Sequence, residues 1–218
     1  TLQRSAEELS PDMVAAKIVR PIDHFTGFHT FYPTFSSGKS AAPFKTLTDY
    51  DNTLKRHDGY ILFLDRAQGR FREGMASGVV DTKLTIGIVV QQLDNMLETP
   101  IDESPFMGPT KAFPADFSEA DKARLTKDFR AKTEQIYAAN KQLRDFLANE
   151  YLPVARDGVG LSYMKGGDAY YNMLIKSHTT LDLSADEIHT IGLSEVARIK
   201  GDMGKVMAEV GFKGTLPE

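Results

Sequence analysis

The sequence has 218 residues, of which 41% are hydrophobic and 26% charged, so it can bury a sizeable core. Its formal net charge of −4 argues against a nucleic-acid partner, and no apolar run approaches the length of a membrane span. Because the chain contains no cysteine, disulfides, thiolate metal sites and cysteine nucleophiles are excluded.

The first 43 residues predict a short helix followed by an aromatic segment. Ser10 before Pro11 is typical of a helix start, and Pro21 ends that helix after Arg20. Residues 22–43 carry many aromatic side chains without helical spacing, and these would not stay in water. We therefore interpret residues 22–43 as an ordered loop. Its ring-bearing residues are His24, Phe25, Phe28, His29, Phe31, Tyr32 and Phe35.

Three long helices are predicted because each has a start signal, an apolar stripe and a stop signal. They lie near residues 46–76, 118–151 and 185–210. A shorter helix is expected between a cap at Asp81 and Pro100. The fold class is therefore mainly α, with long antiparallel helices packed as an irregular helical bundle.

Prolines and glycines mark the breaks between these helices. Residues 105–114 form a proline-rich loop, so we place a candidate internal boundary at residues 99–117 within one helical region that spans residues 1–218. A glycine-bearing turn over residues 157–167 precedes a further short helix. In the last long helix, Gly192, Gly201 and Gly204 would each cost about 1 kcal/mol relative to alanine, so we expect a neighbour to pack closely there.

No motif in the chain has the context that its chemistry needs. Residues 33–40 resemble a phosphate-binding loop, but Pro33 replaces its first glycine and Pro43 follows too soon for a helix, so a polar surface turn is expected. None of the five histidines begins HExxH, and no nucleophile elbow or dinucleotide fingerprint is present. We expect His57, on an apolar helix stripe, to be a hydrogen-bonded core residue.

Candidate substrate-binding residues are Tyr170, Tyr171 and His178, and no residue is assigned a catalytic or metal-binding role. His178 follows the tyrosine pair and precedes a polar Thr179-Thr180 turn, which favours a place near a cleft. The alternative is a structural role, in which His178 interacts with the dipole at the helix C-terminus. His24 and His29 lie five residues apart in a loop and would offer a loose two-point metal site at best.

Several short motifs in a fixed order resemble the bacterial family called domain of unknown function 885 (DUF885). The resemblance covers roughly residues 28–214. The motifs are Ala42-Pro43-Phe44-Lys45-Thr46, Glu103-Ser104-Pro105-Phe106, Asn149-Glu150-Tyr151-Leu152-Pro153, Arg156-Asp157-Gly158-Val159-Gly160-Leu161, Gly166-Gly167-Asp168-Ala169-Tyr170-Tyr171, His178-Thr179-Thr180, and the segment from Leu183 to Ile199.

Members of this family are longer, often exported, and grouped with zincin-like metallopeptidases because of an HExxH helix in their later half. The resemblance implies that this chain is the N-terminal portion of such a protein, that zinc is the cofactor of the full-length protein, and that an exported or periplasmic location, including that of a lipoprotein, is expected. No position here matches the HExxH helix, so no catalytic or zinc-binding residue is carried over.

Two functions remain open. In the first, the chain is the N-terminal helical portion of a zinc-dependent peptidase or hydrolase and supplies one wall of the peptide-substrate cleft, while the missing C-terminal half is its partner and holds the metal. In the second, it is a non-enzymatic helical binding or scaffold module, which the aromatic residues 24–35 favour. We expect this chain alone to be catalytically inactive, without a cofactor of its own, and to self-associate through an exposed apolar cleft wall.

Overall fold

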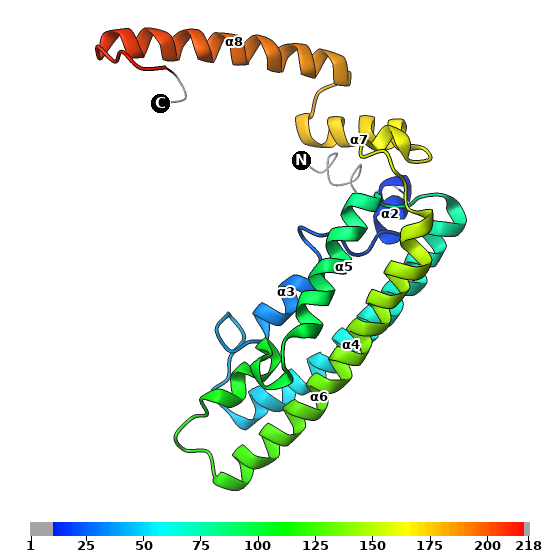
Figure 1. The fold of residues 1–218 in the computed structure, drawn as a ribbon, viewed down its shortest axis with the longest axis vertical. Helices are drawn as coiled ribbons and strands as arrows, with labels where there is room; N and C mark the ends of the chain where they lie inside the picture. The colour runs from blue at the N-terminus through cyan, green and yellow to red at the C-terminus, as the bar shows by residue number, and fades with distance from the viewer. Residues whose placement is uncertain (1–10, 216–218) are drawn as a thin grey trace. The chain divides into compact units, whose positions relative to one another are not determined.

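The computed structural model describes residues 11–215, and all the regular elements in this range are helices (Figure 1). The prediction of a mainly α fold is confirmed. The β structure in the described range amounts to one isolated bridge between Thr82 and Arg156. The chain divides into a larger compact unit, residues 14–165, and a smaller unit that includes residues 166–215.

The helices begin and end where local signals place them. After α2 (Pro11–Ile18), the larger unit contains α3 (Phe28–Phe35), α4 (Leu47–Ser77), α5 (Lys83–Glu98), η1 (Ile101–Glu103), η2 (Pro105–Lys111), α6 (Glu119–Phe146), η3 (Leu147–Tyr151), η4 (Leu152–Val154) and η5 (Leu161–Tyr163). Thr46 and Ser118 cap α4 and α6. The predicted cap at Asp81 is wrong by one residue, because the Thr82 hydroxyl accepts the Thr85 amide while Asp81 faces Arg20.

The three main helices of the larger unit run up, down and up in sequence (Figure 1). Ion pairs between α4 and α6 advance along both helices together, from Asp51–Arg124 to Asp58–Lys132, so these two helices are parallel. Asp94 of α5 pairs with Arg144 of α6, and the Thr99 carbonyl, which follows α5, accepts from the Tyr137 hydroxyl of α6. Contacts that advance along α5 therefore recede along α6, so α5 is antiparallel to α6 and to α4 (Figure 1). The antiparallel packing expected from the sequence thus holds for α5, whereas α4 and α6 share one direction because α5 returns the chain between them.

Two apolar clusters lie along the contact between α4 and α6. The larger one is built on Leu64 and Phe71 from α4 and Ile136 and Leu143 from α6, all fully buried. The smaller one surrounds Tyr50, near the start of α4. η2 contributes to both, since Phe106 belongs to the first cluster and Met107 to the second. The proline-rich residues 99–117 therefore lie inside the larger unit, packed against α6.

The aromatic segment is partly helical, which corrects the prediction of a loop over residues 22–43. α3 forms because His29, Tyr32 and Pro33 recur at helical spacing and are buried. The Tyr32 ring stacks on Tyr60 of α4 with centroids 4.4 Å apart. Such tertiary contacts stabilise a two-turn helix that contains a proline and would not form alone. The sequence did not reveal this helical spacing, because the exposed Phe28 and Phe31 are as apolar as the buried residues beside them.

His57 is a core residue, as predicted. Its side chain is fully buried, and its Nδ1 lies 2.8 Å from the Tyr32 hydroxyl. Its Nε2 has no hydrogen-bond partner in the described range, and the rings of Phe106 and Phe129 stand edge-on to the imidazole. Burial lowers the pKa of His57 to about 4, and the positive charges of Lys132 and Arg56 act in the same direction.

The smaller unit contains α7 (Gly167–Thr179) and α8 (Ala185–Glu209). α8 starts at the predicted capping box of Ser184 and Glu187. No residue of α8 is buried among the described residues. The neighbour predicted at Gly192, Gly201 and Gly204 is not found within residues 11–215, where nothing lies within 4 Å of the added Cβ positions.

Acidification should destabilise the fold through His57. Unfolded histidine binds a proton near pH 6.5, whereas folded His57 stays neutral down to about pH 4, so stability is lost as the pH falls through this window. The difference between the two pKa values corresponds to roughly 3 kcal/mol in the free energy of unfolding. His57→Gln should therefore make the free energy of unfolding, measured by urea denaturation, depend less steeply on pH across that window. His189→Gln, at an exposed position on α8, is the matched control for the loss of an imidazole. A wild-type slope in His57→Gln would contradict the account.

Candidate functional site

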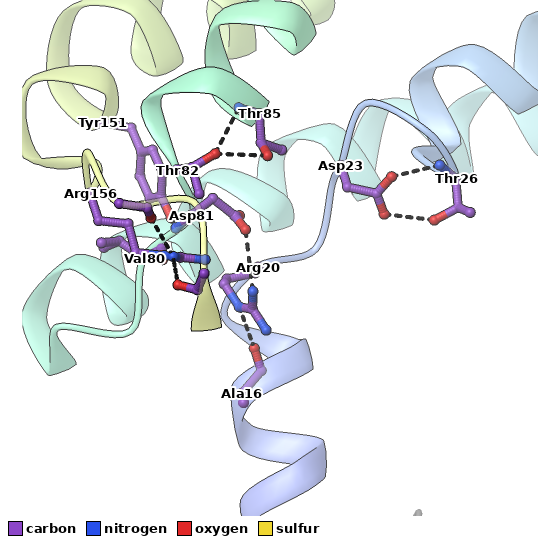
Figure 2. Close-up of polar contacts among 12 residues, drawn as sticks. Ala16, Arg20, Asp23, Thr26, Val80, Asp81, Thr82, Thr85, Tyr151 and Arg156 are labelled. Atoms are coloured by element: carbon purple, nitrogen blue, oxygen red, sulfur yellow. Dashed lines mark hydrogen bonds and ion pairs between the residues drawn. The ribbon is translucent and has the colours of Figure 1, made fainter. Parts of the chain in front are cut away.

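Polar side chains from distant segments meet near the end of α6, in the larger unit (Figure 2). The Arg156 guanidinium donates hydrogen bonds to the backbone oxygens of Val80, Gly158 and Gly160. The Tyr151 hydroxyl accepts the Asp81 amide at 2.8 Å. The Arg156 amide in turn donates to the Asp81 carbonyl, and the Lys83 amide donates to the Arg156 carbonyl. These bonds tie the chain after α6 to residues 80–83, and we call this group the α6 junction.

Local sequence explains how the α6 junction forms. α6 continues into a π-helical turn, η3, which places Tyr151 at the buried end of the helix. Pro153 then ends the helical run. A Cβ on Gly158 would lie 2.1 Å from the Tyr163 ring, so only glycine fits where the following loop folds back. The motifs around Tyr151 and Arg156, which carry the family resemblance, thus have a structural role.

Charge at the α6 junction is balanced by burial and pairing. Asp81 is buried, and its Oδ1 lies 3.4 Å from Nη1 of Arg20. The Nε of Arg20 donates to the Ala16 carbonyl. Burial raises the pKa of Asp81, while Arg20 and Arg156 partly oppose that shift. Burial likewise raises the pKa of Tyr151 and lowers that of Arg156. Because its donors and acceptors bind protein groups, we interpret the α6 junction as a structural clamp. Sequence reasoning missed Arg20 and treated Asp81 as a cap, since neither lies in a recognisable motif.

The three candidate substrate-binding residues lie on α7. Tyr170 is buried, Tyr171 is 46% exposed and His178 is exposed, so the tyrosine pair points in two directions. Tyr171 and His178 are seven residues apart, about two turns, and share one side of the helix. Thr180 ends the helix with a left-handed φ of 63° and donates its amide to the Lys176 carbonyl. A pocket of about 440 Å³ beside α7 is lined by residues such as Asn172, Lys176 and Asp182, and by none of the three candidates.

The histidines of the described residues do not fit a zinc site. His29 is buried with Nε2 2.9 Å from Oε1 of Gln92, whereas His24 is exposed and its carbonyl accepts the Gln92 amide. Throughout residues 11–215, no group of three or more His, Cys, Asp or Glu side chains could hold a metal ion. Zinc sites in proteins typically have three or four such ligands.

Comparison with known proteins defines the family. The chain matches the profile of the family described as "Bacterial protein of unknown function (DUF885)" over residues 1–218, and it therefore belongs to this family. No curated protein matches the chain. A similar solved structure is "The crystal structure of the putative lipoprotein from Colwellia psychrerythraea", with 21% sequence identity and a TM-score of 0.80.

That likeness extends over 89% of this chain and 34% of the Colwellia chain. The chain thus spans about a third of the length of this structural relative. At 21% identity the likeness shows the fold alone, and it agrees with the helical architecture described above. In the part of the chain that the structure describes, no helix is both long enough and apolar enough to cross a membrane.

Replacing Arg156 should test the α6 junction. Arg156→Lys keeps the charge but cannot supply the same planar set of donors to Val80, Gly158 and Gly160. We expect the free energy of unfolding, measured by urea denaturation, to fall by roughly 2 kcal/mol. Arg66→Lys, at an exposed position on α4, is the matched control and should change it little. Equal losses in the two variants would show that Arg156 does not clamp the loop.

Proposed function

We propose that this chain is the N-terminal helical portion of a larger, exported zinc-dependent peptidase and contributes one wall of its substrate cleft. The zincin-like character rests on the family resemblance, and the metal ligands would lie outside residues 11–215. The relative named as a lipoprotein supports export, and the 34% coverage of its chain supports a larger protein. The observation that carries the proposal is the exposed apolar face of α8.

The apolar face of α8 is continuous along the helix. Val196, Ile199, Met203 and Val206 follow the helical repeat, and between 46% and 55% of each residue is exposed. Gly192 lies on the same stripe, with open space around it in the described chain. An apolar stripe of this length on an otherwise polar helix is typical of a surface that another element covers. In the proposal, the remainder of the larger protein covers it.

The end of this face is hollowed. Ile199, Met203, Val206 and Phe212 help to line a groove of about 490 Å³ in which apolar surface predominates. The flanking charges pair with one another on the helix, since Arg198 binds both Glu195 and Asp202. The groove is therefore bordered by neutralised charge, which suits an apolar protein element better than a charged ligand.

Within this proposal, the exposed Tyr171 and His178 face the peptide, and the buried Tyr170 holds α7 in place. An aromatic ring and an imidazole on one helix side can offer apolar contact and a hydrogen bond to a peptide group. His178 would be a positioning residue that acts on substrate orientation. Its role as a partner of the dipole at the C-terminus of α7 remains the structural alternative.

A second candidate function is a non-enzymatic binding module. The observation that favours it is the aromatic surface formed by Phe28 and Phe31, whose ring centroids lie 6.0 Å apart and which are 37% and 57% exposed. Phe25, shortly before them in the chain, is 86% exposed. Phe28 packs against Phe63 of α4 with centroids 5.2 Å apart, so this surface is anchored to the larger unit. Exposed aromatic rings held on a rigid support are typical of interaction surfaces.

Metal content and peptide cleavage separate the two functions. After dialysis, the longer protein should retain about one zinc per chain, as a catalytic zinc site requires, and should cleave members of a mixed peptide pool, whereas the 218-residue chain should do neither. In the longer protein, His178→Ala should lower turnover without lowering the melting temperature, and His189→Ala is its exposed control. Firm zinc binding with cleavage by the 218-residue chain would contradict the proposal. Absence of both from the longer protein would favour the binding module.

A further inference from the structure

A second concave site lies in the larger unit, beside the polar turn at residues 36–43. It is a pocket of about 570 Å³ between that turn, the start of α4 and η2. Its volume falls in the usual range for small-molecule sites, roughly 300 to 1,000 Å³. None of the residues in the α6 junction or on α8 lines it. The pocket therefore needs an explanation of its own.

The charge of this pocket has one sign. Its charged lining residues are Lys39, Lys45 and Lys111, and no carboxylate lines it. None of these three lysines forms an ion pair in the described structure, and all three are exposed. Several lysines elsewhere do pair with carboxylates, as Lys122 does with Glu119. The chain as a whole has a net charge of −4, whereas three unpaired lysines give this pocket a positive charge that attracts anions.

The walls of the pocket are held by specific contacts. The Ser37 carbonyl oxygen would lie 2.2 Å from a Cβ on Gly108, so glycine permits the turn to press against η2. Gly38 adopts φ +79°, and the Tyr50 hydroxyl donates to the Pro109 carbonyl at 3.2 Å. The pocket is therefore formed by the packing of the larger unit and does not depend on the exposed lysines for its shape.

Hydrogen-bond donors also remain available along the turn. The backbone amides of Gly38, Ser40 and Ala41 donate to no acceptor within residues 11–215. The carboxylate of Asp49 does not line the pocket, and its Oδ2 accepts the amides of Lys45 and Thr46 at the start of α4. Free backbone amides beside ammonium groups are a combination that suits oxyanions.

We propose that this pocket binds a small soluble polyanion, of the size and charge of a pyrophosphate or phosphomonoester group. Three lysine charges match a ligand with two or more negative charges better than a single carboxylate. The concave shape favours a small molecule over a flat anionic surface. The site differs from a nucleotide-binding loop of the strand–loop–helix type, because α3 precedes the turn and Pro43 follows it. The inference is independent of the peptidase proposal.

Calorimetric titration of the chain with pyrophosphate at constant ionic strength tests this site. The double variant Lys39→Gln/Lys111→Gln should weaken pyrophosphate binding about tenfold. This figure assumes roughly threefold for each lost ion pair between an exposed lysine and the ligand. The matched control is Lys55→Gln/Lys127→Gln, which removes two exposed lysines that do not line the pocket and should change affinity less than about twofold. Wild-type affinity should also fall as salt rises.

Two results would overturn the inference. One is no detectable pyrophosphate binding at millimolar concentration, and the other is equal weakening by the two double variants. A second experiment measures binding of the chain to vesicles containing phosphatidylglycerol, whose headgroups carry phosphate. Vesicle capture that depends on Lys39 and Lys111, without binding of soluble pyrophosphate, would also contradict a small-molecule pocket. Circular dichroism of each variant should match the wild type, because the substituted side chains are exposed.

Discussion

The contact between α4 and α6 is the constraint on which the larger unit depends. These helices are parallel, so α5 must return the chain between them. η2 packs against α6 and contributes Phe106 and Met107 to the two apolar clusters. Burial of large apolar side chains along this contact supplies the main favourable free energy. The polar groups that enter it, such as His57 with Tyr32, are tolerated because each has at least one partner.

The α6 junction and the pocket beside residues 36–43 show how loops acquire defined shapes against the packed helices. At one end, Arg156 and Tyr151 satisfy backbone groups of residues 80–83, which would otherwise be buried without partners. Beside the start of α4, Gly108 lets the turn at Ser37 approach η2. Satisfied backbone groups therefore produce a closed clamp in one place, whereas the packing of the turn against η2 leaves a pocket with free donors in the other.

Sequence patterns predicted what depends on local chemistry. Caps, apolar stripes and stops located α4, α6 and α8 to within a residue or two, apart from the π-helical turn at the end of α6. Contacts between distant segments were not predictable in this way. α3 forms because Tyr32 packs on Tyr60, and Arg20 joins the α6 junction through Asp81. Lys39 and Lys111, 72 residues apart in the sequence, line one pocket because the fold brings their segments together. The candidates Tyr170, Tyr171 and His178 were expected near one helix and lie on α7.

The apolar face of α8 connects the fold with the proposed function, since Ile199, Met203 and Val206 are suited to burial and yet exposed. Backbone hydrogen exchange along α8 tests this most directly, because covered helices exchange through rarer opening. In the longer protein, amides of residues 192–206 should exchange far more slowly than in the 218-residue chain, while those of α4 and α6 should differ little. Equally fast exchange of α8 in both proteins would contradict the claim that another part of the protein covers this face.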